Sequence, residues 1–196
     1  LVAVGDACGH SVQAAFVMTA VRSAMRAVID DAESGSLDST VVVAKINRAL
    51  YRVTAGHQFM SCLVGIIDRK RMVFDYTNAG HPVPILYRQG QGVSLESHGL
   101  PLGILTDAEY SSSQVALRGE DLLVLFSDGL LETMNEAEEL FQPAGVMSAL
   151  SATATADPLD EVLEQIWGSC ERHGVGDVQD DRTLLVVRMK QTKGPR

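Results

Sequence analysis

The sequence has few of the residues that mark disulfide-stabilised, membrane-embedded or nucleic-acid-binding proteins. Its 196 residues include only three cysteines, Cys8, Cys62 and Cys170, without a CxxC pair, so neither a disulfide framework nor a zinc site is indicated. A net charge of −9 argues against binding to nucleic acid or anionic membranes. No apolar run approaches the roughly 20 residues that span a bilayer, and no signal-peptide pattern begins the chain. We therefore expect a cytoplasmic protein without membrane insertion.

The composition predicts one globular domain, because 46% of the residues are hydrophobic and no low-complexity tract or internal repeat interrupts them. We expect this domain over residues 1–190, followed by a C-terminal tail over residues 191–196. The chain begins with Leu1 in an apolar run that reads as mid-strand, so we expect further residues upstream.

Hydrophobic periodicity predicts helices over residues 11–29, 39–53, 138–150 and 158–170. Asp38 or Ser39 can cap the second helix, and Asp157 with Pro158 can begin the last, whose apolar stripe includes Trp167 as an expected core anchor. Strands are expected over residues 59–68, 72–77, 83–87, 111–117, 122–126 and 183–189. Paired helices and hairpins without regular βαβ alternation favour an α+β domain of antiparallel sheets with helices outside.

Three aspartates, Asp6, Asp128 and Asp180, each lie beside Gly or another acid at the end of an extended apolar segment. Any one of them could be an ordinary turn residue. If the fold brings them together, their carboxylates would repel one another unless a proton or a cation intervened, and Mg²⁺ and Mn²⁺ prefer such oxygen ligands. A metal cluster is the economical interpretation, since the sequence contains no GxSxG, Walker, GxGxxG or HExxH motif.

Five segments, taken in order, resemble the motifs of the metal-dependent PPM/PP2C protein phosphatases, in particular the bacterial SpoIIE/RsbU-like branch. They are residues 5–10 (GDACGH), 76–82 (YTNAGHP), 99–103 (GLPLG), 125–132 (LFSDGLLE) and 180–188 (DDRTLLVVR). The resemblance implies an α-β-β-α sandwich of two antiparallel sheets flanked by helix pairs. It also implies that the family's first strand, which carries another metal-binding acid, would precede Leu1.

The resemblance further implies a site for two Mn²⁺ or Mg²⁺ ions. By position, Asp6 would bridge the two ions, the backbone carbonyl of Ala7 would help to hold one, and Asp128 with Asp180 would hold the other. Asp181 would support these ligands or be structural. Two such ions activate a shared water for attack on a phosphoserine or phosphothreonine.

The same comparison bears on two histidines. His10 either donates a proton to the leaving oxygen or serves only in helix capping or loop packing. His81 stands where the eukaryotic branch carries an acid, so we expect it to pack under the turn over residues 79–82 rather than to bind a third metal.

The sequence thus supports three functional hypotheses. The first is a protein serine/threonine phosphatase that acts on a signalling protein, by resemblance a phosphorylated anti-sigma-factor antagonist, under the control of an upstream sensory or receiver domain. The second is a non-catalytic interaction domain with the same fold. The third is a fold whose aspartates are only structural, which predicts no metal-dependent rise in thermal stability.

Overall fold

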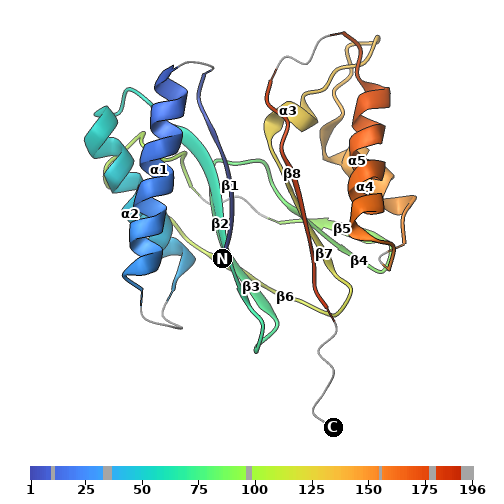
Figure 1. Ribbon diagram of the computed structural model, residues 1–196, viewed down its shortest axis with the longest axis horizontal. Coiled ribbons are helices and arrows are strands. Elements are labelled where there is room, and N and C mark those ends of the chain that lie inside the picture. Colours follow the sequence, from blue (N-terminus) through green and yellow to red (C-terminus); the bar gives the residue numbers. More distant parts are fainter. Residues whose placement is uncertain (10–11, 33–36, 96–98, 155, 177–179, 191–196) are drawn as a thin grey trace. The chain divides into compact units, whose positions relative to one another are not determined.

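A computed structural model describes residues 1–9, 12–32, 37–95, 99–154, 156–176 and 180–190 (Figure 1). The chain divides into two compact units. Unit 1 comprises residues 1–81 and 96–116, and unit 2 comprises residues 82–95 and 117–196. Each unit contains one four-stranded antiparallel sheet, so the predicted antiparallel α+β character is confirmed.

The sheet of unit 1 has the strand order β1-β2-β3-β6. The strands are β1 (Val2–Ala7), β2 (Met60–Asp68), β3 (Val73–Ala79) and β6 (Ser113–Ala116). The predicted hairpin over residues 59–77 is β2 and β3, in which Asp68 pairs with Val73. In the register of β1 with β2, Asp6 lies opposite Ser61 and Ala7 opposite Met60, so Asp6 is near the C-terminal end of an outer strand.

Two helices, α1 (Val12–Asp30) and α2 (Ser39–Thr54), lie side by side and cover this sheet (Figure 1). Asp38 caps α2 as predicted, because its carboxylate accepts hydrogen bonds from the backbone N–H groups of Thr40 and Val41 at 2.8 and 3.2 Å. The apolar sides of the helices and the sheet share one core cluster, whose members include Val17, Val21, Val43, Ile46, Leu50, Cys62 and Val64.

Helix α1 corrects the expectation that no segment could reach across a membrane. With 19 residues and a mean hydropathy of 1.3, it is the one helix in the described ranges that is long and apolar enough to do so. It nevertheless packs against α2, with Val17 and Val21 buried in the core. A mostly buried core helix and a signal sequence near the N-terminus pass the same test, so the length and composition of α1 alone assign no membrane span.

The sheet of unit 2 has the strand order β5-β4-β7-β8. The strands are β4 (Ile85–Arg88), β5 (Gln91–Ser94), β7 (Leu122–Phe126) and β8 (Leu184–Arg188). Every residue of β7 is buried, as its continuous apolar run predicts for a strand covered on both faces. The helices of this unit are α3 (Asp128–Leu131), α4 (Gln142–Ser151) and α5 (Leu159–His173), and α5 contacts β8 (Figure 1).

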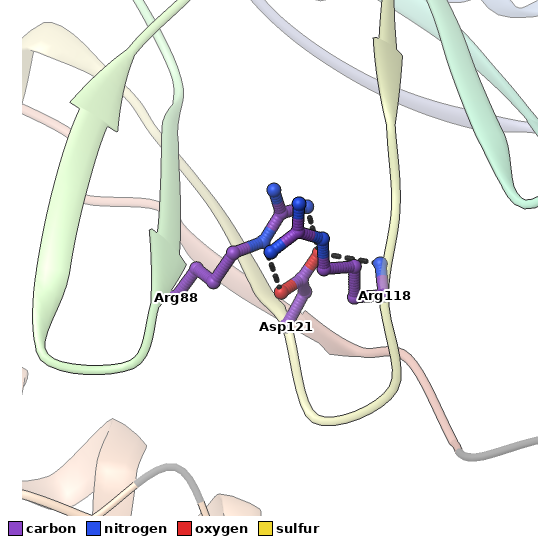
Figure 2. Close-up of polar contacts among 3 residues, drawn as sticks. All are labelled: Arg88, Arg118 and Asp121. Atoms are coloured by element: carbon purple, nitrogen blue, oxygen red, sulfur yellow. Dashed lines mark hydrogen bonds and ion pairs between the residues drawn. The ribbon is translucent and has the colours of Figure 1, made fainter.

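An ion pair fastens the turn before β7 to β4 (Figure 2). The guanidinium of Arg88 donates through Nε and Nη2 to the two carboxylate oxygens of Asp121, at 2.8 and 2.5 Å. The backbone N–H of Arg118 donates to the same carboxylate at 2.7 Å. The hydrogen bonds that Arg88 donates to Asp121 raise the pKa of Arg88. This bidentate geometry holds two separate segments of unit 2 together.

Three predictions about the helices of unit 2 need correction. Helix α4 begins at Gln142 rather than at residue 138, because the side chain of Asn135 accepts the N–H groups of Ala137 and Glu139 and so forms a local turn. Helix α5 begins one residue later than expected, and its expected cap, Asp157, instead accepts the N–H of Ala154. The short helix α3 was not anticipated from the sequence.

Trp167, expected as a core anchor, is 38% exposed on α5. The stripe of α5 that contacts the sheet instead buries Val162, Ile166 and Cys170. Trp167 follows Ile166 by one residue, and a step of about 100° around the helix carries its ring off this stripe.

Candidate metal centre

Asp6 lies on β1 of unit 1, in a position fixed by close contact with β2. A side chain on the preceding Gly5 would place its Cβ atom 2.7 Å from the carbonyl oxygen of Ser61, so only glycine lets the two strands approach this closely. Beyond the strand, the backbone N–H of Cys8 donates to the carbonyl of Phe59 at 3.2 Å. The carboxylate of Asp6 is partly buried, and Ala7, whose carbonyl is a predicted ligand, is buried.

Asp128 lies in unit 2, where β7 ends and α3 begins. Its carboxylate accepts the N–H of Gly129 at 3.0 Å, and its backbone carbonyl accepts the N–H of Glu132 at 2.8 Å. The side chain is partly buried and offers its oxygens at the end of a strand that is itself completely buried. A carboxylate in such a place is fixed by the sheet and still accessible to a ligand.

Asp180 lies close to Asp128 because β7 and β8 are antiparallel neighbours, in which Phe126 pairs with Leu184. The end of β7 therefore meets the start of β8, and an acid after one strand lies near an acid before the other. Carboxylate oxygens of Asp128 and Asp180 lie within 4.8 Å of each other. The backbone N–H of Asp181 donates to the carboxylate of Asp180 at 2.8 Å.

Ser127 and Gly129 hold these two acidic segments together. The hydroxyl of Ser127, which is 3% exposed, donates to the carbonyl of Asp181 at 3.0 Å and accepts the N–H of Thr183 at 2.8 Å. A Cβ atom on Gly129 would lie 2.5 Å from that same carbonyl of Asp181. Sequence reasoning missed both residues, because their roles depend on the pairing of β7 with β8.

The other predicted site residues divide into three cases. His10 lies outside the described residues. The carboxylate of Asp181 is on an exposed residue, and its backbone carbonyl makes the contact with Ser127. His81 is buried as expected under its turn, with Nδ1 2.9 Å from the hydroxyl of Ser61 and its backbone N–H donating to the side chain of Asn78 at 2.7 Å.

The donor set in unit 2 fits a hard divalent cation. Two partly buried carboxylates lie within 4.8 Å, and like charges at this separation favour a bound cation or proton between them. Neither a sulfur nor a nitrogen ligand is among the predicted metal ligands, and an all-oxygen set is typical of Mg²⁺ or Mn²⁺ sites.

Comparison with known proteins agrees with the sequence motifs. Residues 1–190 match the family described as Stage II sporulation protein E (SpoIIE). The chain is 27% identical over 191 residues to the phosphoserine phosphatase RsbU of Bacillus subtilis, in an alignment that covers 96% of this chain and 55% of RsbU. The chain thus spans about half the length of that relative.

Solved structures with the same fold include the SiaA-PP2C domain of Pseudomonas aeruginosa, with a TM-score of 0.83, 23% identity and coverage of 96% of this chain and 75% of that one. The catalytic domain of the serine threonine protein phosphatase PstP, in complex with two manganese ions, has a TM-score of 0.69 and 16% identity over 94% of this chain and 85% of its own. The PP2C fold predicted from the sequence is confirmed. With its family profile matched over residues 1–190, the chain belongs to the SpoIIE family.

Proposed function

We propose that this chain is a metal-dependent protein serine/threonine phosphatase domain. The observation that carries the proposal is the pair of carboxylates, Asp128 and Asp180, held within 4.8 Å at the meeting point of β7 and β8 in a member of the SpoIIE family. The naming of its relative RsbU as a phosphoserine phosphatase supports the same activity.

By the family resemblance, Asp128 and Asp180 would hold one Mn²⁺ or Mg²⁺ ion, and Asp6 with the backbone carbonyl of Ala7 would hold a second. The two manganese ions of PstP support this number and type of ion. When bound, such ions lower the pKa of a bound water and neutralise phosphoryl charge. Asp181 supports the site through its backbone rather than as a ligand.

The residues of this chain have separate roles in the proposed hydrolysis. Asp6, Asp128 and Asp180 fix the ions, while Ser127 fixes the segment that carries Asp180. His10 is our candidate proton donor to the leaving serine or threonine oxygen, with helix capping as its alternative role. The substrate is a phosphorylated signalling protein, for which an anti-sigma-factor antagonist is the candidate by resemblance, and an upstream sensory or receiver domain would control access.

The experiment compares the chain with Asp128→Asn, in Mn²⁺ and in EDTA. We expect Mn²⁺ to raise the melting temperature of the unchanged chain and to support phosphate release from phosphoserine peptides, because a ligand that binds only the folded state stabilises it. Asp128→Asn should lose both effects. Asp181→Asn is the matched control, since its exposed carboxylate is not a proposed ligand, and it should retain the Mn²⁺-dependent shift.

The two competing hypotheses give different results in this experiment. A Mn²⁺-dependent rise in melting temperature without phosphate release, from a chain that includes its natural upstream segment, would indicate a non-catalytic interaction domain. No rise at any Mn²⁺ concentration would indicate that the aspartates are only structural.

A further inference from the structure

A pocket of about 270 Å³ lies in unit 2 directly beside the proposed metal centre. Asp180 forms part of its wall, together with residues from the end of α5 and from the segment after α3. The charged side chains of the wall are Glu132, Glu171, Asp180 and Arg182. If Asp180 is a metal ligand, the two glutamates still outnumber the single guanidinium, so the pocket favours a cationic side chain.

Arg182 forms no close ion pair with these glutamates in the described part of the chain. No ion pair within 4.0 Å joins it to any residue in the described part of the chain, and its Nε atom is buried without a hydrogen-bond partner there. A buried donor of this kind is costly unless an acceptor is supplied. The pocket therefore offers the carboxylates of Glu132 and Glu171 to a cation, which a protein segment supplies as a basic side chain.

A second hollow of about 360 Å³ lies next to this pocket and shares Glu171 with it. Its wall is mostly apolar and includes Leu163, Trp167 and Leu184, where α5 runs beside β8 (Figure 1). The indole Nε1 of Trp167 donates to the carboxylate of Glu171 at 2.9 Å. Because the indole N–H already has a hydrogen-bond acceptor, the partly exposed ring of Trp167 presents apolar surface to a partner.

We propose that these two hollows together dock the phosphoprotein substrate. A Lys or Arg side chain near the phosphorylated residue occupies the Glu132–Glu171 pocket, and a neighbouring apolar side chain packs against Trp167. This proposal rests on the proposed function. Asp180 is both a proposed metal ligand and part of the pocket wall, so a substrate whose phosphate lies at the metal centre would also reach the pocket. Side chains on one face of an extended segment recur about every 6.6 Å, which lets a single strand serve two adjacent hollows.

The charge of the pocket identifies its occupant as basic. A Glu or Asp at the same position of the substrate would face two carboxylates, and like charges at close range destabilise a complex.

The chain provides its own probe for the test, since Trp167 is its only tryptophan. Synthetic phosphoserine peptides carrying one Lys, placed in turn at each position within four residues of the phosphoserine, are titrated while tryptophan fluorescence is recorded. A second series carries Glu instead. We expect the best Lys peptide to bind at least about fivefold more tightly than its Glu counterpart at low salt, with the difference shrinking in 0.5 M salt.

The double variant E132Q/E171Q should reduce this discrimination to less than about twofold, because glutamine keeps the shape and the acceptor for Trp167 but removes the charge. The matched control E161Q removes an exposed carboxylate from the first turn of α5 outside both hollows and should keep the full discrimination. Equal binding of the Lys and Glu peptides, or unchanged discrimination in E132Q/E171Q, would overturn the proposal. So would a dimer of the free chain that E132Q/E171Q dissociates, since a second copy would then occupy the surface.

Failure of the docking proposal is distinguishable from failure of the phosphatase proposal. Hydrolysis of p-nitrophenyl phosphate with Mn²⁺, by a chain that includes its natural upstream segment, tests the phosphatase proposal with a substrate that has no flanking residues. Turnover of this ester together with equal binding of Lys and Glu peptides would overturn the docking surface alone. The opposite result is tighter binding of the Lys peptides than of the Glu peptides, without hydrolysis of any phosphate ester. It would overturn the phosphatase proposal but would still show that the two hollows bind a basic segment.

Discussion

Arg88 and Asp121 form a bidentate ion pair in which the carboxylate is almost completely buried, with a side-chain exposure of 2%, while the arginine side chain is 24% exposed. Among the described residues, replacing Arg88 with Ala leaves this carboxylate with the N–H of Arg118 as its remaining hydrogen-bond donor. Removal of one partner from a buried pair is costly because the other charge stays desolvated. We expect the free energy of unfolding to fall by about 2–4 kcal/mol, measured by urea denaturation.

The exposed pair of Arg26 and Asp30 is the control for this measurement. These residues join at 3.1 Å with side-chain exposures of 77% and 60%, so Arg26→Ala should cost less than about 0.5 kcal/mol. Similar losses for the two variants would contradict the assignment of a structural role to the buried pair.

Gly129→Ala should damage the segment that carries Asp180. The added methyl group would lie 2.5 Å from the backbone carbonyl of Asp181, and no flexible side chain can move aside to relieve the clash. We expect a loss of about 1–3 kcal/mol in stability and, if the metal centre is as proposed, weaker Mn²⁺ binding by calorimetry. Gly168→Ala is the control on α5, where the methyl group meets only the end of the Arg172 side chain and should be neutral or stabilising.

Ser127→Ala tests whether Ser127 positions the segment that carries the proposed metal ligand Asp180 without being a ligand itself. The variant leaves the carbonyl of Asp181 and the N–H of Thr183 without their shared hydroxyl partner, which should cost about 1–3 kcal/mol. Metal affinity should fall by roughly 10–100-fold, as for other residues that orient ligands, while Asp128 and Asp180 are both still present. An unchanged Mn²⁺ affinity would show that the pairing of β7 with β8 suffices without this hydroxyl. Ser151→Ala, which removes an exposed hydroxyl of α4, is the matched control.

The elements that the sequence predicts best are those in which local pattern and tertiary burial agree. The five apolar residues of β7 and the Asp38 cap of α2 need no knowledge of distant residues, and both are confirmed. Local reasoning fails at α4, where Asn135 forms a turn that competes with a helix start, and at Trp167, whose position on the rim depends on where the sheet lies. An apolar residue type indicates that a side chain favours burial. It does not indicate which face of the helix packs against the sheet.

The candidate site could be predicted in part because its ligand residues lie at strand ends. Asp128 and Asp180 are 52 residues apart in the chain, and the antiparallel pairing of β7 with β8 is what brings them together. Ser127 and Gly129 lacked any sequence signal beyond their place beside an acid. Their roles arise only when the backbone of Asp181 comes within hydrogen-bond distance.

Cys62 should make the stability of unit 1 sensitive to alkaline pH. Complete burial raises the pKa of its thiol from 9.0 to about 12, so the folded state keeps the thiol neutral while the unfolded state ionises near pH 9. Its contribution is therefore fully present below pH 9 and is lost as the pH rises from 9 toward 12. Between pH 8 and about 10.5 we expect the free energy of unfolding to fall by roughly 2 kcal/mol more in the unchanged chain than in Cys62→Ala.

Tyr110 and Cys8 provide the controls for this pH dependence. Burial, and secondarily the charge of Cys62, raises the pKa of Tyr110 from 10.0 to about 12, so Cys62→Ala should retain a smaller alkaline loss that begins near pH 10. Cys8 is exposed, so Cys8→Ala should show the same pH dependence as the unchanged chain.

A thiol reagent at pH 8 should label Cys8 alone in the folded protein and all three cysteines in urea, because Cys62 and Cys170 are buried. Rapid labelling of Cys62 under native conditions would show that the core around it opens readily, and the expected alkaline loss would then be absent.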